Sequence, residues 1–459
     1  MPVATKDISG NGQPEGGSTA FARALRVGGA VGSFFALKVA VGLALVVQSA
    51  HRLTVSDFGS FSQLFLFLAL LSTISAAGVQ NGVVRQISAA GGAFVRERRT
   101  STAAILIWGC FGLLILFLSI IFRGYISIFL IGSSFAQVAI PLIAAAALAA
   151  GGGQLLCAIL TGRDRAPTSL LLQGTGLLIG GAACWWRLGS GDAVGAVLAY
   201  AAGPIATSVL ALPFAWKWLP RRRAFDRELI AEVRLLLAFS GSFLITSTLM
   251  PMTLFVLRYT YRDQFGAEAL GFWLAANRVS DVTSQLLGLY MGQVYLPSIS
   301  RAIARGALVR RLIYITVIGG CLVMTAGLFV FMSTSSYVVS VFLSERFIPA
   351  IPFVTGYLAG DILRVLTSVA LYTALAQGRF NLYWIIEAAT AALLAVYIGI
   401  SVALHYPAGA YLGYVAAHGT MAVILSVIGL RWIARNSTLG SPENALPNSA
   451  TSLLLNNNK

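Results

Sequence analysis

Twelve apolar stretches, each about as long as a helix that crosses a bilayer, run through most of this 459-residue chain. A helix needs about 20 apolar residues to cross the hydrocarbon core. Charged residues form 10 % of the chain and apolar residues 57 %, whereas soluble proteins have about 25 % and about 45–50 %. The sequence therefore predicts an all-α membrane protein whose expected spans are residues 27–49, 61–83, 101–122, 137–160, 169–189, 193–216, 235–258, 269–297, 312–332, 348–376, 382–404 and 410–433. The stretch Ser336–Phe347 is too short to span and is expected to lie in the membrane interface.

The basic residues are divided unevenly between the loops on the two sides. If the N-terminus is cytoplasmic, 23 of the 32 Lys and Arg residues fall on the cytoplasmic side, 6 on the outer side and 3 inside the membrane. Cytoplasmic loops of membrane proteins are enriched in Lys and Arg. We therefore expect both termini in the cytoplasm, and we interpret the net charge of +16 as a topology signal rather than a nucleic-acid footprint. The six outer residues are Arg52, Arg123, Arg187, Arg258, Arg262 and Arg346.

The two halves of the chain resemble each other weakly. Phe58-Gly59-Ser60-Phe61 stands near the start of the second span and Leu270-Gly271-Phe272-Trp273 near the start of the eighth, and a basic loop follows each of these spans. Many transporters consist of two repeats that hold the substrate between them. We expect a cytoplasmic tail at 1–26, a six-helix bundle at 27–216, a basic linker at 217–234, a second six-helix bundle at 235–433 and a disordered tail at 434–459.

The sequence offers little chemistry for an enzyme. It has no G-x-x-x-x-G-K-[S/T] and no H-E-x-x-H motif, and its three histidines are far apart. The four cysteines stand singly in apolar stretches, which is typical of buried small side chains. The outer loops are also short. We therefore expect no catalytic residue, no cofactor and no metal site.

Six charged residues lie inside the expected spans, where each costs about 2.5–3.5 kcal/mol on insertion scales. They are Lys38, Arg278, Asp281, Asp361, Arg364 and Glu387. One interpretation is structural, because Arg278 and Asp281, like Asp361 and Arg364, are three residues apart and share a helix face. Lys38 has no acidic residue within a helical turn.

The functional interpretation is a cationic cavity for a phosphate-bearing substrate, formed by Lys38, Arg278 and Arg364. In that case Asp281, Asp361 and Glu387 balance the cations or carry a coupling proton. Asn81, Gln63, Asn277 and Gln285 are then candidates to line the cavity and bind sugar hydroxyls. Polar groups also join transmembrane helices, so both interpretations stay open on this evidence.

Several motifs resemble Wzx-type lipid-linked oligosaccharide flippases, including those that carry O-antigen and enterobacterial common antigen lipids. Ala77-Gly78-Val79-Gln80-Asn81-Gly82-Val83-Val84-Arg85 is similar to their Gly-x-x-Asn-Gly-x-x-(Lys/Arg) stretch, and Gly360-Asp361-Ile362-Leu363-Arg364-Val365 to Gly-Asp-x-Leu-(Lys/Arg)-Val. Leu37-Lys38, Ser280-Asp281, Glu387 and Leu296-Pro297-Ser298-Ile299-Ser300-Arg301 also match. The similarity covers about residues 27–433, and Arg278 departs from it.

The resemblance implies the exporter fold of the multidrug/oligosaccharidyl-lipid/polysaccharide superfamily, with two MATE-like bundles around a central cavity. It implies alternating access, ion-gradient coupling and an undecaprenyl-diphosphate-linked oligosaccharide as substrate, moved across the bacterial inner membrane for surface polysaccharide synthesis. The alternatives are an ion-coupled multidrug exporter of the same superfamily, a membrane enzyme that joins sugars, and an assembly scaffold. Contacts with a polysaccharide polymerase and a chain-length regulator stay open.

Overall fold

The computed structural model describes residues 17–90, 92–219, 227–304 and 309–436, and within them it is almost entirely helical, with no strand. The first part holds nine α-helices: α1 (Gly17–Arg52), α2 (Val55–Ser75), α3 (Gln80–Ala89), α4 (Phe94–Ile121), α5 (Arg123–Ile131), α6 (Ala139–Gly162), α7 (Ala166–Leu188), α8 (Ala193–Tyr200) and α9 (Ala202–Ala215). The second part holds α10 (Arg227–Tyr290), α11 (Leu296–Ala304), α12 (Val309–Phe342), α13 (Ile351–Ala376), α14 (Phe380–Ala403) and α15 (Gly409–Asn436). Three short helices complete the described residues: η1 (Trp216–Trp218) after α9, the π-helix η2 (Met291–Tyr295) between α10 and α11, and η3 (Glu345–Ala350) between α12 and α13.

The predicted membrane class is confirmed. Nine helical segments in the described residues are long and apolar enough to cross a membrane, and the predicted spans without such a segment lie on α7 and on α10. Some helices extend beyond the expected spans. Residues 17–26, expected in a tail, belong to α1, and residues 227–234, expected in a linker, begin α10. Residues 1–16, 220–226 and 437–459 lie outside the described part of the chain.

The end of α12 at Phe342 extends beyond the predicted span 312–332. Residues Ser336–Phe342, expected in the membrane interface, continue α12 without a break, and η3 follows after a short turn. The run from Val309 to Phe342 is therefore one helix of 34 residues. At about 1.5 Å per residue such a helix is longer than the hydrocarbon core, so its end projects beyond it.

The seventh and eighth predicted spans form one long helix with a kink. α10 is helical from Arg227 to Tyr290 except at Gly266, whose φ is 89° and ψ 168°. A positive φ is strained for residues with a Cβ, so glycine at 266 permits the sharp change of direction. We call residues 227–265 the first limb of α10, residues 267–290 its second limb, and the end of the molecule that holds Gly266 the kink end.

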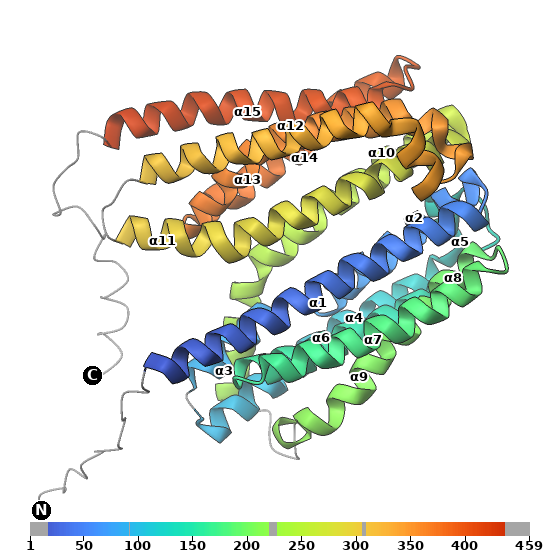
Figure 1. The fold of residues 1–459 in the computed structure, drawn as a ribbon. Helices are drawn as coiled ribbons and strands as arrows, with labels where there is room; N and C mark the ends of the chain where they lie inside the picture. The colour runs from blue at the N-terminus through green and yellow to red at the C-terminus, as the bar shows by residue number, and fades with distance from the viewer. Residues whose placement is uncertain (1–16, 91, 220–226, 305–308, 437–459) are drawn as a thin grey trace, which may run out of the picture.

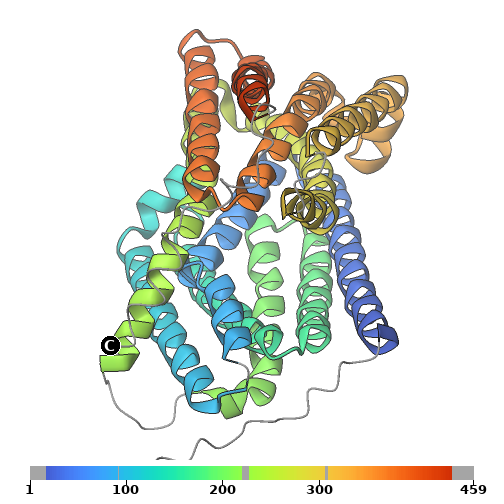
Figure 2. The same cartoon turned by 90° about the vertical axis from the view of Figure 1, so that its left-hand side faces the viewer.

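Two helical bundles, one from each half of the chain, lie side by side and meet at the kink end (Figure 1). The first limb of α10 runs between them (Figure 2). Its start packs on the N-terminal bundle, where Leu229 and Leu236 join that bundle's core and Thr100 donates a hydrogen bond to Glu232 at 2.6 Å. Near the kink, Tyr261 donates to the carbonyl of Pro407 in the C-terminal bundle at 3.0 Å. The first limb therefore connects the two bundles mechanically.

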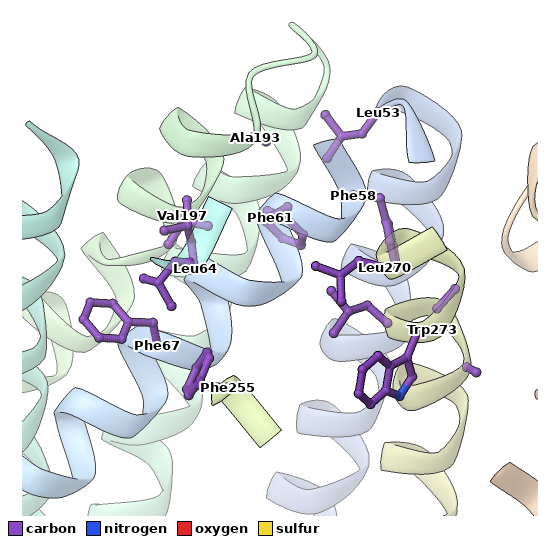
Figure 3. Packing of buried hydrophobic residues seen from close by; sticks show 14 of the residues in the cluster. Leu53, Phe58, Phe61, Leu64, Phe67, Ala193, Val197, Phe255, Leu270 and Trp273 are labelled. Carbon is purple, nitrogen blue, oxygen red and sulfur yellow. The ribbon is translucent and has the colours of Figure 1, made fainter. Parts of the chain in front are cut away.

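The bundles pack closely where α2 crosses the second limb of α10. Gly59 and Gly271 face each other there, and a Cβ on Gly271 would overlap the carbonyl oxygen of Val55. Phe58 packs edge-on against Phe347 of η3 with ring centroids 5.0 Å apart. Figure 3 shows Phe58 beside Leu270, and Phe61, Leu64 and Phe67 along the same helix. This apolar contact closes the kink end of the molecule.

A buried ion pair stabilises the opposite end of the N-terminal bundle. Glu97 is 1 % exposed and accepts two hydrogen bonds from Arg163, at 2.6 and 2.8 Å. The Arg163 guanidinium also lies 4.6 Å above the ring of Trp218. Glu97 therefore links the loop after α6 to α4.

We expect Glu97→Ala to destabilise the folded protein by about 2 kcal/mol, because it leaves a partly buried guanidinium unpaired. The apparent melting temperature in detergent measures the effect. Glu345→Ala removes an exposed carboxylate that has no ion pair among the described residues, and it serves as the matched control. Equal melting temperatures for the two variants would contradict the structural role of Glu97.

Candidate functional site

The three predicted cations lie on three helices and line two adjoining cavities. Lys38 of α1 and Arg278 of the second limb of α10 line a cavity of about 450 Å³, and Arg364 of α13 lines a separate one of about 500 Å³. Asp281 lines both. The space around the predicted cations thus has two compartments that meet at Asp281.

The first compartment, which we call the crevice, is apolar over most of its surface. It lies between α1, α2, the second limb of α10 and α12, and it extends from Lys38 toward Leu343 near the kink end. Its apolar lining includes Leu45, Phe61 and Phe331. Gln285 lines it as well, as predicted for a cavity residue. The crevice has the shape and chemistry to take an apolar chain beside a small charged group.

The two cations of the crevice, Arg278 and Lys38, differ in their contacts with the rest of the protein. Arg278 forms an ion pair with Asp281 at 3.6 Å, donates to the carbonyl of Ser62 at 3.3 Å and lies 5.3 Å above the ring of Phe65. The pairing of Arg278 with Asp281 on one helix face, which the structural interpretation predicted, is therefore present. Lys38, in contrast, has neither an ion pair nor a hydrogen bond within the described part of the chain, and its side chain is exposed. Among the three predicted cations, Lys38 is therefore the one that has no protein partner in the described residues.

The second compartment, the C-terminal cavity, is far more polar. It is lined by residues of α2, both limbs of α10, α13, α14 and α15, among them Asn277, Arg364 and Glu387. Arg364 donates a hydrogen bond to Ser284 at 2.5 Å. Four tyrosines share this lining, Tyr357, Tyr372, Tyr383 and Tyr414. Aromatic faces and hydrogen-bonding groups together suit a sugar, because its ring has apolar faces and polar edges.

Asp361 is placed differently from the other two predicted acids. It is 2 % exposed and accepts hydrogen bonds from Ser280 at 2.8 and 3.0 Å, from Thr283 at 2.5 Å and from Tyr414 at 2.8 Å. Although Arg364 is three residues away, no ion pair joins the two side chains within the described residues. Asp361 therefore ties α13 to α10 and α15, whereas Glu387 faces the cavity with Arg364.

The predicted polar residues also divide into groups. Asn277 lines the C-terminal cavity and Gln285 the crevice. Gln63 is 1 % exposed and contacts Arg258 instead of an open cavity. Asn81 is exposed on α3 and lines neither compartment. The structure thus leaves two of these four predicted residues, Asn277 and Gln285, as cavity lining.

A third compartment, the N-terminal cavity, adjoins the crevice at Lys38. It has a volume of about 430 Å³ and is lined by Gln154, Gln173 and Thr207 among others. Lys38 therefore stands where two cavities meet. The sequence reasoning did not foresee this polar space within the first bundle, because glutamines of separate helices come together only in the folded bundle.

The sequence reasoning also missed two buried polar residues of the C-terminal cavity. Arg258, expected in an outer loop, lies inside the first limb of α10, is 3 % exposed and lines this cavity. His418 is also 3 % exposed, lines the same cavity and packs against Tyr414. The seventh span was predicted to end at residue 258, whereas the helix continues as far as the kink at Gly266.

Several known proteins are similar to this chain in sequence or in fold. A model of a polysaccharide biosynthesis protein family matches residues 37–303, which is more than half of the chain. The chain is 24 % identical to the lipid III flippase of Escherichia coli (strain K12) over 87 % of this chain and 96 % of that one.

Two solved structures share the fold. An inward-facing multidrug resistance MATE family transporter of the MOP superfamily superposes with a TM-score of 0.71 at 15 % identity, over 88 % of this chain and 96 % of that one. The lipid II flippase MurJ in an inward closed conformation also gives 0.71, at 12 % identity over 89 % and 87 %. These matches confirm the predicted exporter architecture of two bundles. The chain belongs to the polysaccharide biosynthesis protein family.

Proposed function

We propose that the protein is a flippase that moves an undecaprenyl-diphosphate-linked oligosaccharide from one leaflet of the membrane to the other. The observation that carries the proposal is the junction of an apolar crevice with a polar cavity at Asp281, with Lys38 and Arg278 beside it. A molecule that fits both compartments has an apolar chain, a polar head and an anionic group between them. A lipid-linked sugar with a diphosphate bridge has these three parts in this order.

The energetics support this assignment of parts. Exposing an apolar chain to water costs about 0.8 kcal/mol for each CH₂ group, so the chain needs an apolar path, which the crevice provides without specific contacts. Lys and Arg bind phosphate oxygens through charge-assisted hydrogen bonds, which are about twice as strong as neutral ones. The C-terminal cavity then receives the sugars and the phosphate next to them, with the half-buried Tyr372 and Tyr383 as stacking surfaces and Asn277 as a hydrogen-bond partner.

The proposal includes the orientation of the chain and the membrane in which it lies. The likeness to a bacterial lipid III flippase supports a location in the bacterial inner membrane. The positive charge of the loops favours cytoplasmic chain termini, which puts the kink end on the periplasmic side. The structure then has its periplasmic end closed. Alternation then requires the two bundles to move apart there. The translocated unit would meet a polysaccharide polymerase and a chain-length regulator on that side.

An ion-coupled exporter of cationic drugs is the competing function, since a multidrug transporter shares the fold. An organic cation in these cavities would lie beside Lys38, which has no anionic partner within the described residues, and beside Arg364. That arrangement is repulsive, so the lipid-linked sugar is favoured. Catalysis has no part in the proposal, because transport needs differential binding in two states and no bond is broken.

The test is transport of an undecaprenyl-diphosphate-linked oligosaccharide in proteoliposomes, together with restoration of surface glycan in the native host lacking this gene. We expect Lys38→Ala to lower the transport rate about tenfold or more, because one charge-assisted contact to phosphate is lost. Lys38→Arg should retain most of the rate. Lys217→Ala removes an exposed lysine of η1 and is the matched control.

Each outcome separates the two functions. Transport of the lipid-linked sugar by the wild type, with loss in Lys38→Ala and not in Lys217→Ala, supports the flippase. Export of organic cations without movement of the lipid would overturn it. Full transport by Lys38→Ala at equal membrane levels would show that the site assignment is wrong even though the function holds.

A further inference from the structure

Arg258 is a buried cation that has no carboxylate partner among the described residues. Its guanidinium donates to Asn277 Oδ1 at 2.8 Å and to Gln63 Oε1 at 3.4 Å, and both acceptors are neutral amides. Its Nε is buried without any hydrogen-bond partner. Asp281, which lines the same cavity, is ion-paired with Arg278 instead. A charge removed from water in this way is costly unless a partner of opposite sign reaches it.

The position of Arg258 joins the C-terminal cavity to the contact between the bundles. Gln63 belongs to α2 in the N-terminal bundle, and Asn277 belongs to the second limb of α10. Arg258 also lines the C-terminal cavity, so a ligand there can reach it. The bond to Gln63, at 3.4 Å, is longer than the usual 2.7–3.2 Å and is the weaker of the two.

One face of the first limb holds the bundles together at the kink end. Phe255 packs against Phe67 (Figure 3), and Tyr259 stacks on Phe129 with centroids 5.1 Å apart. Arg262 donates to the carbonyl of Ile128 at 2.8 Å. These positions recur every three or four residues with Arg258 between them, so they share one helix face. When the kink end opens, this face must leave the N-terminal bundle and Arg258 must leave Gln63.

We propose that Arg258 is an anion-binding residue that couples capture of the substrate to opening of the kink end. A phosphate oxygen of the lipid-linked sugar, once in the C-terminal cavity, replaces the Gln63 amide on the guanidinium. The exchange trades a weak neutral contact for a charge-assisted one, and it releases α2 from the first limb of α10. A ligand shifts a conformational equilibrium only by binding one state better, and Arg258 supplies that difference. This inference rests on the proposed function for the identity of the ligand.

The test measures the separation of the bundles at the kink end by double electron–electron resonance. Spin labels are placed at Ser190→Cys in the turn before α8 and at His405→Cys in the turn before α15, both exposed. The four native cysteines are first replaced by serine, and inorganic diphosphate is the probe. We expect diphosphate to lengthen the distance in this background. Arg258→Gln should keep the short distance and lose the response.

Two substitutions at Gln63 decide the question if Arg258→Gln does not insert. Gln63→Leu removes the acceptor at similar volume, and it should lengthen the distance without any ligand. Gln63→Glu forms an ion pair with Arg258, and it should raise the diphosphate concentration for half-maximal opening about tenfold or more. Gln137→Glu makes the same chemical change at an exposed turn and should leave the response unchanged.

The inference is overturned if diphosphate does not alter the distance, or if Gln63→Glu responds at the same concentration as the Gln137→Glu control. Its failure is distinguishable from failure of the proposed function. If the wild type transports the lipid-linked sugar but diphosphate does not change the distance between the labels, the flippase function is supported and the proposed role of Arg258 is wrong. If the distance responds but no lipid-linked sugar is moved, the anion site stands and the flippase is wrong.

Discussion

Gly271→Ala is expected to lower transport about 10- to 100-fold while leaving the amount of inserted protein unchanged. The added methyl group would overlap the carbonyl oxygen of Val55, which is backbone and cannot rotate away. Overpacking of this kind costs about 1–3 kcal/mol. The cost applies only when α2 lies on the second limb of α10, so it falls on the state with a closed kink end.

The neighbouring Gly59→Ala provides a matched control. Its Cβ would lie 3.4 Å from the Cα of Gly271, which is an ordinary van der Waals distance. The two substitutions add the same group to the same helix crossing, yet only one of them overlaps backbone. Transport in proteoliposomes and the distance between labels at residues 190 and 405 measure the effect. If Gly271→Ala transports as well as Gly59→Ala, closure of the kink end by this contact is not needed for transport.

The sequence predicts the helices well because the bilayer restricts the choice. Backbone groups in hydrocarbon must be hydrogen-bonded within the helix, so an apolar stretch of sufficient length has one outcome. The breaks are harder to predict. Ala77 has φ 47° and Gly78 has φ 64° in the turn between α2 and α3, within a stretch that was expected to continue as one span. Packing against α6 determines such local breaks, and hydropathy carries no trace of it.

The candidate site was predicted in part for a similar reason. A charged residue in an apolar stretch is visible in sequence, so Lys38, Arg278 and Arg364 could be selected, but the walls between them come from the packing of five or more helices. Arg258 was missed because it stands at the end of the predicted span 235–258 and was counted with the outer loop. For Asp361, in contrast, the sequence suggested a contact that the structure does not have. Its sequence spacing suggested a pair with Arg364, whereas the folded structure surrounds it with three hydroxyl residues.

Arg364→Ala is expected to lower transport about 10- to 100-fold, since a bidentate contact with phosphate is worth more than a single bond from lysine. Arg364 is half-buried, donates to Ser284 and faces the C-terminal cavity with Glu387. Arg364→Lys keeps the charge but not the planar fork, so its rate should fall between those of alanine and arginine. Arg379→Ala, at an exposed loop position, is the control.

A double variant separates a role in binding from a role in folding. Arg364→Ala leaves Glu387 without a cation in the same cavity, and this alone can reduce the amount of folded protein. Arg364→Ala/Glu387→Gln restores neutrality, so we expect normal membrane levels with transport still low. Recovery of transport in the double variant would show that Arg364 only balances Glu387. Persistent loss at normal levels would assign Arg364 to the substrate, because the charge balance of the cavity is then intact while the anion contact is still missing.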